Sequence, residues 1–150
     1  MLEKEVGFDI HAAARDLQTG STFHYRGDEL CKTASVIKLS ILAHTSLLVE
    51  EGSLDWDEKL TLTEQEKVAG SGVLTSLTAG LKMSIQDVCT LMMIISDNTG
   101  TNMMIERLGT KGINARMRDL GLIKTNCFRK AYTPDKEDSM PFGLGSTTAD

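Results

Sequence analysis

The sequence predicts an α+β protein in which strands come first and helices follow. Two extended stretches near the N-terminus flank a polar, Gly-containing connection, and from about residue 35 onward apolar side chains recur at helical spacing. The chain has 150 residues, of which 41% are hydrophobic and 25% charged, enough for one domain with a buried core.

The first predicted element is a β-hairpin. Residues 6–17 and 21–26 form its strands, and QTG at residues 18–20 connects them. Two strands alone are marginally stable in water. We therefore expect the hairpin to pair with further strands or, alternatively, to lie on the helices.

The second predicted element is a helix from residue 35 to about residue 50. Ile37, Ile41 and Leu48 recur along it at helical spacing, and Gly52 supplies a stop signal. This helix would place one apolar face in the core.

A mostly loop-forming stretch over residues 53–80 separates this helix from a strongly apolar one at residues 84–95. Ser84 followed by Asp87 is a capping-box arrangement, which fixes the start of the second helix. We expect this helix to be central and buried.

Two shorter helices, each ended by glycine, are predicted at residues 101–109 and 111–121, followed by a long loop over residues 124–145. The final STTAD, residues 146–150, has hydroxyl residues followed by an acidic one, which is a helix-start signature. The helix itself would lie further on, so we expect a C-terminal part to be missing. The alternative is a fraying tail.

Composition excludes several classes of partner. The net charge of −5 provides no basic stripe, so neither nucleic acid nor an anionic membrane surface is predicted. The apolar runs are too short for a membrane span, and the N-terminus lacks a signal-peptide layout. Cys31, Cys89 and Cys127 have no disulfide or metal-ligand spacing and are predicted to be core thiols. No metal or cofactor is predicted.

Ser35 and Lys38 predict a nucleophile and its base. Residues three apart share a helix face, so the lysine amine would lie close to the serine hydroxyl. A helix N-terminus and partial burial both favour neutral lysine, which can take a proton. The backbone N–H of Ser35 could donate to an oxyanion. The alternative is a capping serine beside a lysine whose amine reaches solvent.

The tripeptide SDN, residues 96–98, strengthens this interpretation. It follows the central helix and is rare by chance, although it could also be an ordinary polar turn. Together the two motifs supply a nucleophile, a base, a second hydroxyl and a side-chain amide, which are the parts of an acyl-transfer site.

SVIK followed by SDN resembles the class A serine β-lactamases and the related penicillin-binding proteins, whose motifs are S-x-x-K, S-D-N and K-T-G. The likeness covers essentially the whole chain, including GSGVL at residues 70–74. It implies a two-subdomain β-lactamase-like fold, α+β to α/β in class. Residues 1–30 would be the β-hairpin of the sheet subdomain and residues 31–150 most of the helical subdomain, together a single incomplete domain without its C-terminal strands.

The resemblance implies a role for each matched residue. Ser35 would be the acylated nucleophile and Lys38 the group that exchanges protons with it. Ser96 would relay a proton to the leaving β-lactam nitrogen. Asn98 would contact Lys38 and the acylamide of the substrate, and Ser71 would lie in a loop at the rim of the cleft.

Four further expectations follow from the resemblance. Asp97 would hold the turn, and the family's helix-linking disulfide is not matched because Cys89 has no plausible partner on the nucleophile helix. The setting would be exported, periplasmic or extracellular. The substrate would be a β-lactam or an acyl-D-Ala-D-Ala compound.

Two family features are missing from the sequence. TKG at residues 110–112 is not K-T-G, so the strand with that motif is expected beyond Asp150, supplied by a missing C-terminal segment or a second chain. The E-x-x-L-N pattern that carries the deacylating glutamate is also absent. Its expected position is near Ala131 or Tyr132, and Glu137 is interpreted as a solvated loop charge.

Three functions remain open at this point. The first is a serine hydrolase that opens β-lactams through an acyl-serine intermediate. The second is a slow-turnover penicillin-binding D-alanyl-D-alanine peptidase or sensor. The third is a catalytically incomplete fragment.

Overall fold

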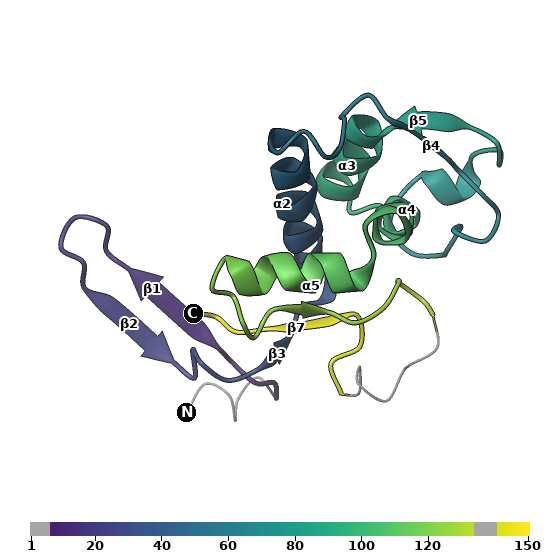
Figure 1. Cartoon of the computed structure of the whole chain (residues 1–150). Coiled ribbons are helices and arrows are strands. Elements are labelled where there is room, and N and C mark those ends of the chain that lie inside the picture. The colour runs from purple at the N-terminus through teal and green to yellow at the C-terminus, as the bar shows by residue number, and fades with distance from the viewer. Residues whose placement is uncertain (1–6, 134–140) are drawn as a thin grey trace.

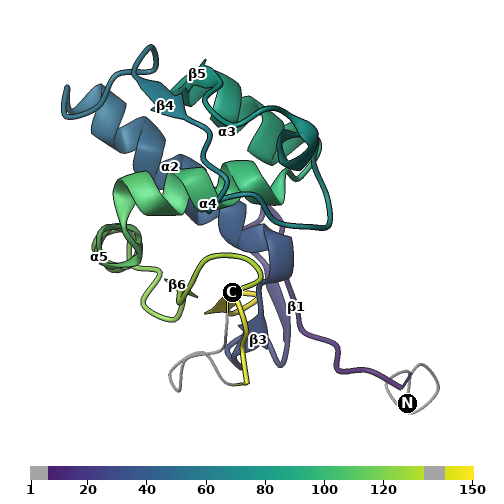
Figure 2. The same cartoon turned by 90° about the vertical axis from the view of Figure 1, so that its right-hand side faces the viewer.

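The computed structural model describes residues 7–133 and 141–150. The α-helices pack together as the main body, and the first two strands project from it as a separate arm (Figure 1). Turned by a quarter, the same helices lie above a small sheet that contains the C-terminal residues (Figure 2). The buried apolar side chains come mainly from three helices, α2 (Ile37–Glu50), α3 (Ile85–Ile94) and α4 (Asn98–Leu108).

The predicted hairpin is confirmed, although its strands are shorter than expected. β1 (Ala12–Arg15) and β2 (Thr22–Tyr25) pair antiparallel with Ala12 opposite Tyr25. The Asp16 carboxylate accepts hydrogen bonds from the backbone N–H groups of the turn. The hairpin forms a two-stranded sheet of its own among the described strands.

The first predicted helix begins two residues later than expected. A 3₁₀ turn, Ala34–Val36, precedes α2 (Ile37–Glu50), so Ser35 lies in the turn rather than in the α-helix. Gly52 has a φ of 70°, a left-handed conformation that glycine adopts without strain, and this confirms the predicted stop.

The other predicted helices are confirmed. α3 (Ile85–Ile94) starts at the Ser84–Asp87 capping box. α4 (Asn98–Leu108) begins earlier than predicted, because the Asp97 carboxylate caps it by accepting the Gly100 N–H. α5 (Thr110–Asp119) packs against α2.

The expectation that residues 53–80 are mostly loop is confirmed, and two short elements interrupt the loop. β4 (Lys59–Thr61) pairs antiparallel with β5 (Lys82–Ser84), and a 3₁₀ turn, Leu74–Ser76, lies between them. These strands are three residues long, too short to show an alternating pattern.

The helix start predicted at residues 146–150 is wrong, and so is the absence of strands from 124 to 145. β7 (Gly145–Thr147) lies between β3 (Cys31–Lys32) and β6 (Asn126–Cys127). Pairing with two neighbours satisfies the β7 backbone, so the hydroxyls of STTAD need not cap a helix; Ser146 instead donates its hydroxyl proton to the Lys124 carbonyl.

Gly145 shows how closely this sheet is packed. A Cβ at this position would lie 2.6 Å from the Asn126 carbonyl oxygen and 2.8 Å from Thr33 Oγ1. The sheet therefore joins the residues just before Ser35 to the segment that follows α5.

The predicted core thiols are confirmed for Cys89 and Cys127, which are buried and form no disulfide; burial raises their pKa values to about 11 and about 12. Cys31 is also a free thiol but only partly buried. In the part of the chain that the structure describes, no helix is long and apolar enough to cross a membrane. Within residues 7–133 and 141–150, no cluster of His, Cys, Asp or Glu is arranged to hold a metal ion.

Candidate active site

Lys38 lies at the centre of a polar cluster formed by both sequence motifs. Its Nζ lies 3.1 Å from Ser35 Oγ, 2.7 Å from Ser96 Oγ, 2.8 Å from the Ser96 carbonyl oxygen and 3.1 Å from Asn98 Oδ1. The structure therefore brings together four of the five predicted site residues, which are separated by up to 63 positions in the chain.

The types of oxygen around Lys38 decide what its amine can do. Two of them, the Ser96 carbonyl and Asn98 Oδ1, only accept hydrogen bonds, whereas the Ser35 and Ser96 hydroxyls can also donate. A neutral amine has two N–H groups and one lone pair, so it can donate to some of the oxygens and accept the proton of a hydroxyl. Ser35 is the hydroxyl that would benefit as a nucleophile.

Burial favours the neutral form of the Lys38 amine. The residue is 2% exposed, and desolvation lowers its pKa below the ordinary value, while the nearby Asp97 carboxylate raises it by a smaller amount. A lysine with a lowered pKa can serve as a general base nearer neutral pH.

Ser96 lies on the turn between α3 and α4. Its φ of 57° is left-handed, which is uncommon for a residue other than glycine and is often found at functional sites. In this conformation its hydroxyl donates to Ser35 Oγ at 3.1 Å while its carbonyl oxygen accepts from Lys38. The three polar groups thus form a closed triangle.

Asp97 holds this turn in place, in agreement with its predicted structural role. It is fully buried, and one carboxylate oxygen accepts the N–H groups of Val73 and Leu74 at 2.7 and 2.9 Å. The other oxygen accepts the Gly100 N–H. Gly72 packs directly against it, since a Cβ at Gly72 would lie 2.2 Å from the Asp97 carboxyl carbon.

Asn98 connects the cluster to the loop that contains Ser71. Its backbone N–H donates to the Ser71 carbonyl at 2.9 Å, and its side-chain Nδ2 donates to the Ala69 carbonyl at 3.3 Å. Ser71 is therefore next to Asn98 through its backbone. Its side chain is not among the groups that line the pocket at Ser35.

An open pocket of about 320 Å³ lies at Ser35. We call Ser35, Lys38, Ser96 and Asn98 the helix side of the site. The segment 129–132, which forms the opposite wall with Leu144, is the loop side.

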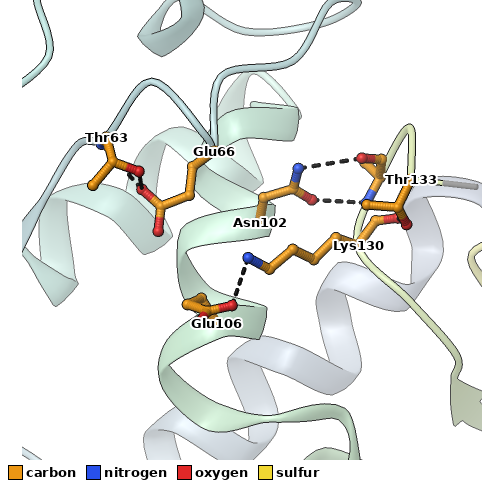
Figure 3. Close-up of polar contacts among 7 residues, drawn as sticks. Thr63, Glu66, Asn102, Glu106, Lys130 and Thr133 are labelled. Carbon is orange, nitrogen blue, oxygen red and sulfur yellow. Dashed lines mark hydrogen bonds and ion pairs between the residues drawn. The ribbon is translucent and has the colours of Figure 1, made fainter.

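The loop side is attached to α4 by two contacts (Figure 3). Asn102 is 1% exposed; its Oδ1 accepts the Ala131 N–H at 2.7 Å and its Nδ2 donates to the Ala131 carbonyl at 3.2 Å. Lys130 forms an ion pair of 2.5 Å with Glu106. Glu137 lies outside the described residues.

Sequence reasoning missed the function of Asn102 in positioning this wall. A signal was present, because Asn98 and Asn102 are four residues apart in α4 and therefore share a face. The contact of Asn102 with Ala131, 29 residues away, leaves no local pattern.

Comparison with known proteins identifies the family of this chain. Residues 1–149 match the model of the beta-lactamase enzyme family. The chain belongs to this family. A β-lactamase of Streptomyces lavendulae is 30% identical over 152 residues, which is 98% of this chain and 49% of the relative. Beta-lactamase AER-1 of Aeromonas hydrophila is 28% identical over 89% of this chain and 43% of the relative.

Solved structures show the same likeness. An ancestral class A β-lactamase aligns with a TM-score of 0.83 and 26% identity, over 99% of this chain and 56% of that chain. A mutant of PBP-A, solved as an acyl-enzyme complex with penicillin G, aligns with a TM-score of 0.79 and 29% identity, over 93% and 52% of the two chains. The class A resemblance and the β-lactamase-like fold are thus confirmed, and the chain spans about half the length of the curated relatives that it matches.

Proposed function

We propose that this chain opens β-lactams through an acyl-serine intermediate at Ser35. In this reaction Ser35 Oγ forms a bond to the lactam carbonyl carbon, and the carbon–nitrogen bond of the ring then breaks. The Ser35 proton passes to Lys38 and from there through Ser96 to the leaving nitrogen. The backbone N–H of Ser35 would be one oxyanion donor.

The observation that carries this proposal is the placement of the buried Lys38 amine within hydrogen-bonding distance of both hydroxyls. Serine needs a base within this distance. Ser96 also contacts Ser35 directly, so a proton can move around the triangle without passing through bulk water. The matched family and the penicillin acyl-enzyme of PBP-A support the same chemistry.

A second candidate is a penicillin-binding protein with slow turnover, and the loop side of the pocket favours it. Arg129, Lys130, Ala131 and Tyr132 form this wall where the family's deacylating glutamate was expected. None of these four side chains is a carboxylate. Hydrolysis of the acyl-serine needs a base to activate water, so acylation would be faster than release.

One experiment separates these functions. The chain is incubated with a chromogenic cephalosporin, followed by absorbance, and with benzylpenicillin, followed by intact mass. Continuous colour development indicates hydrolysis, whereas one colour burst with a lasting mass adduct indicates slow turnover. No colour and no adduct in this chain would mean that the proposed function is wrong for these 150 residues and that they are a catalytically incomplete fragment.

A further inference from the structure

Tyr132 has an unusual conformation next to the pocket. Its φ is 57°, in the left-handed region that bulky residues rarely adopt. The residue is 66% exposed. The preceding residue, Ala131, is fixed at both its N–H and its carbonyl by Asn102. The buried amide clamp thus holds the backbone just before the strained tyrosine.

The tyrosine extends from the loop side toward the helix side. A Cβ built on Gly70 would lie 2.5 Å from the Tyr132 hydroxyl oxygen and 2.7 Å from Asn98 Nδ2. The phenol and the Asn98 amide therefore both approach the same small area at Gly70. Only glycine leaves room for them, and Gly70 also has a positive φ of 92°.

Tyr132, Asn98 and Ser35 line one pocket. An acyl group bonded to Ser35 carries its side chain only a few atoms from the reacting carbonyl, within a pocket of about 320 Å³. The exposed phenol ring is the aromatic surface of that pocket. Ring pairs prefer stacked or edge-to-face contacts and add to binding beyond the area they bury.

We infer that Tyr132 is a specificity-determining residue that contacts an aromatic acyl side chain of the substrate. This inference rests on the proposed function. It names the preferred substrate class as acyl compounds with a ring next to the amide, over those with a small aliphatic group. The residue with the left-handed backbone is thus the one whose phenol lies at Gly70.

The test compares two penicillins that differ only in the ring. Benzylpenicillin carries a phenylacetyl group, and 6-acetamidopenicillanic acid keeps the amide but has no ring. Second-order acylation rate constants are measured by intact mass for the wild-type chain, Tyr132→Asn and Tyr132→Phe. Asparagine tolerates a left-handed backbone, so it removes the ring without a conformational penalty.

We expect Tyr132→Asn to reduce the preference for benzylpenicillin by about fivefold and Tyr132→Phe to change it by less than about twofold. If Tyr132→Asn lowers the acylation rate constants of both penicillins equally, or leaves the preference unchanged, the inference is overturned while the proposed function stands. If Tyr132→Phe loses the preference as much as Tyr132→Asn does, the contact with the ring is overturned. No adduct from either penicillin in the wild-type chain would refute the proposed function and this inference with it.

Discussion

The two sides of the pocket are built differently. On the helix side, the Lys38 amine lies within 3.1 Å of four oxygens, and the buried Asp97 fixes the turn that carries Ser96. On the loop side, Asn102 fixes the Ala131 backbone, and the neighbouring side chains are alanine, tyrosine and two cations. Groups suited to acylation thus converge on one side only.

This difference separates two halves of a hydrolytic cycle. Acylation needs a base and a proton relay at Ser35, and both lie on the helix side. Deacylation needs a base for water, which would have to reach the acyl group from another direction. Variants on each side should therefore change different rate constants.

The largest effect is expected from removing the base on the helix side. Lys38→Ala should lower the acylation rate about 100-fold or more, because a positioned base contributes that much. Lys32→Ala, which removes an exposed lysine from neighbouring β3, is the control and should leave the rate unchanged. An equal rate in the Lys38 variant would remove it from the mechanism. Acylation is measured by intact mass after rapid quenching.

The pH dependence gives Lys38 a second signature. Burial lowers its pKa, so the fraction of neutral amine, and with it the acylation rate, should rise with pH and level off at a pH below the ordinary lysine pKa. The stability of the fold should also rise with pH. Between the lowered and the ordinary lysine pKa the unfolded chain binds more protons than the folded chain, so raising the pH favours the folded state. A rate that is independent of pH through this window would contradict a neutral-lysine base.

A smaller effect is expected from adding a base on the loop side. Ala131→Glu should speed loss of the penicillin adduct by about tenfold or more, since a carboxylate there could activate water next to the acyl group. Ala131→Gln has nearly the same shape without the charge and serves as the control. We also expect Glu137→Gln to leave the adduct lifetime unchanged. A shorter lifetime in both Ala131 variants would indicate a loosened wall instead of base catalysis.

The contact between the Asn102 side chain and the Ala131 backbone has a matched counterpart elsewhere in the molecule. Asn102 binds both backbone groups of Ala131, and Asn114 binds both backbone groups of Cys127 in the same way, at 2.7 and 2.9 Å. Replacing either asparagine by alanine should cost about 1–3 kcal/mol of unfolding free energy, because the backbone groups lose their partners. Only Asn102→Ala should also change the penicillin acylation or release rates. Denaturant unfolding and adduct kinetics check the two parts.

The smallest effect is expected at His44, which does not line the pocket. Its Nδ1 is buried and has no hydrogen-bond partner among the described residues, and desolvation followed by Arg116 lowers its pKa, partly offset by Glu51. The unfolded chain then binds more protons just below the ordinary histidine pKa, so stability should fall as pH drops through this window. His44→Leu should make stability less dependent on pH in thermal melts between about pH 5 and about pH 7. An unaltered slope would remove His44 as its cause.

The sequence predicts those parts of the fold that have local signals. The capping box at Ser84, the stop at Gly52 and the hairpin turn each depend on neighbouring residues. The S-x-x-K spacing places Lys38 beside Ser35 because one turn of helix joins them. These predictions need no information about tertiary contacts.

Long-range pairings explain what the sequence does not predict. β6 and β7 are two and three residues long and are defined only by their partners, so STTAD resembles a helix start although its first two residues, Ser146 and Thr147, pair in a strand. Likewise, nothing near Ala131 indicates that Asn102 will bind it. Tyr132, with its left-handed backbone, directly follows the residue that Asn102 binds, and a tyrosine at this position gives no sequence signal for that conformation.

The most direct test of the account is whether penicillin bonds to Ser35. The wild-type chain and Ser35→Ala are incubated with benzylpenicillin, denatured, weighed by intact mass and mapped by peptide fragmentation. The account predicts a single adduct on the peptide that contains Ser35 and none in the variant. An adduct that survives Ser35→Ala at full yield, or maps to another residue, would contradict it.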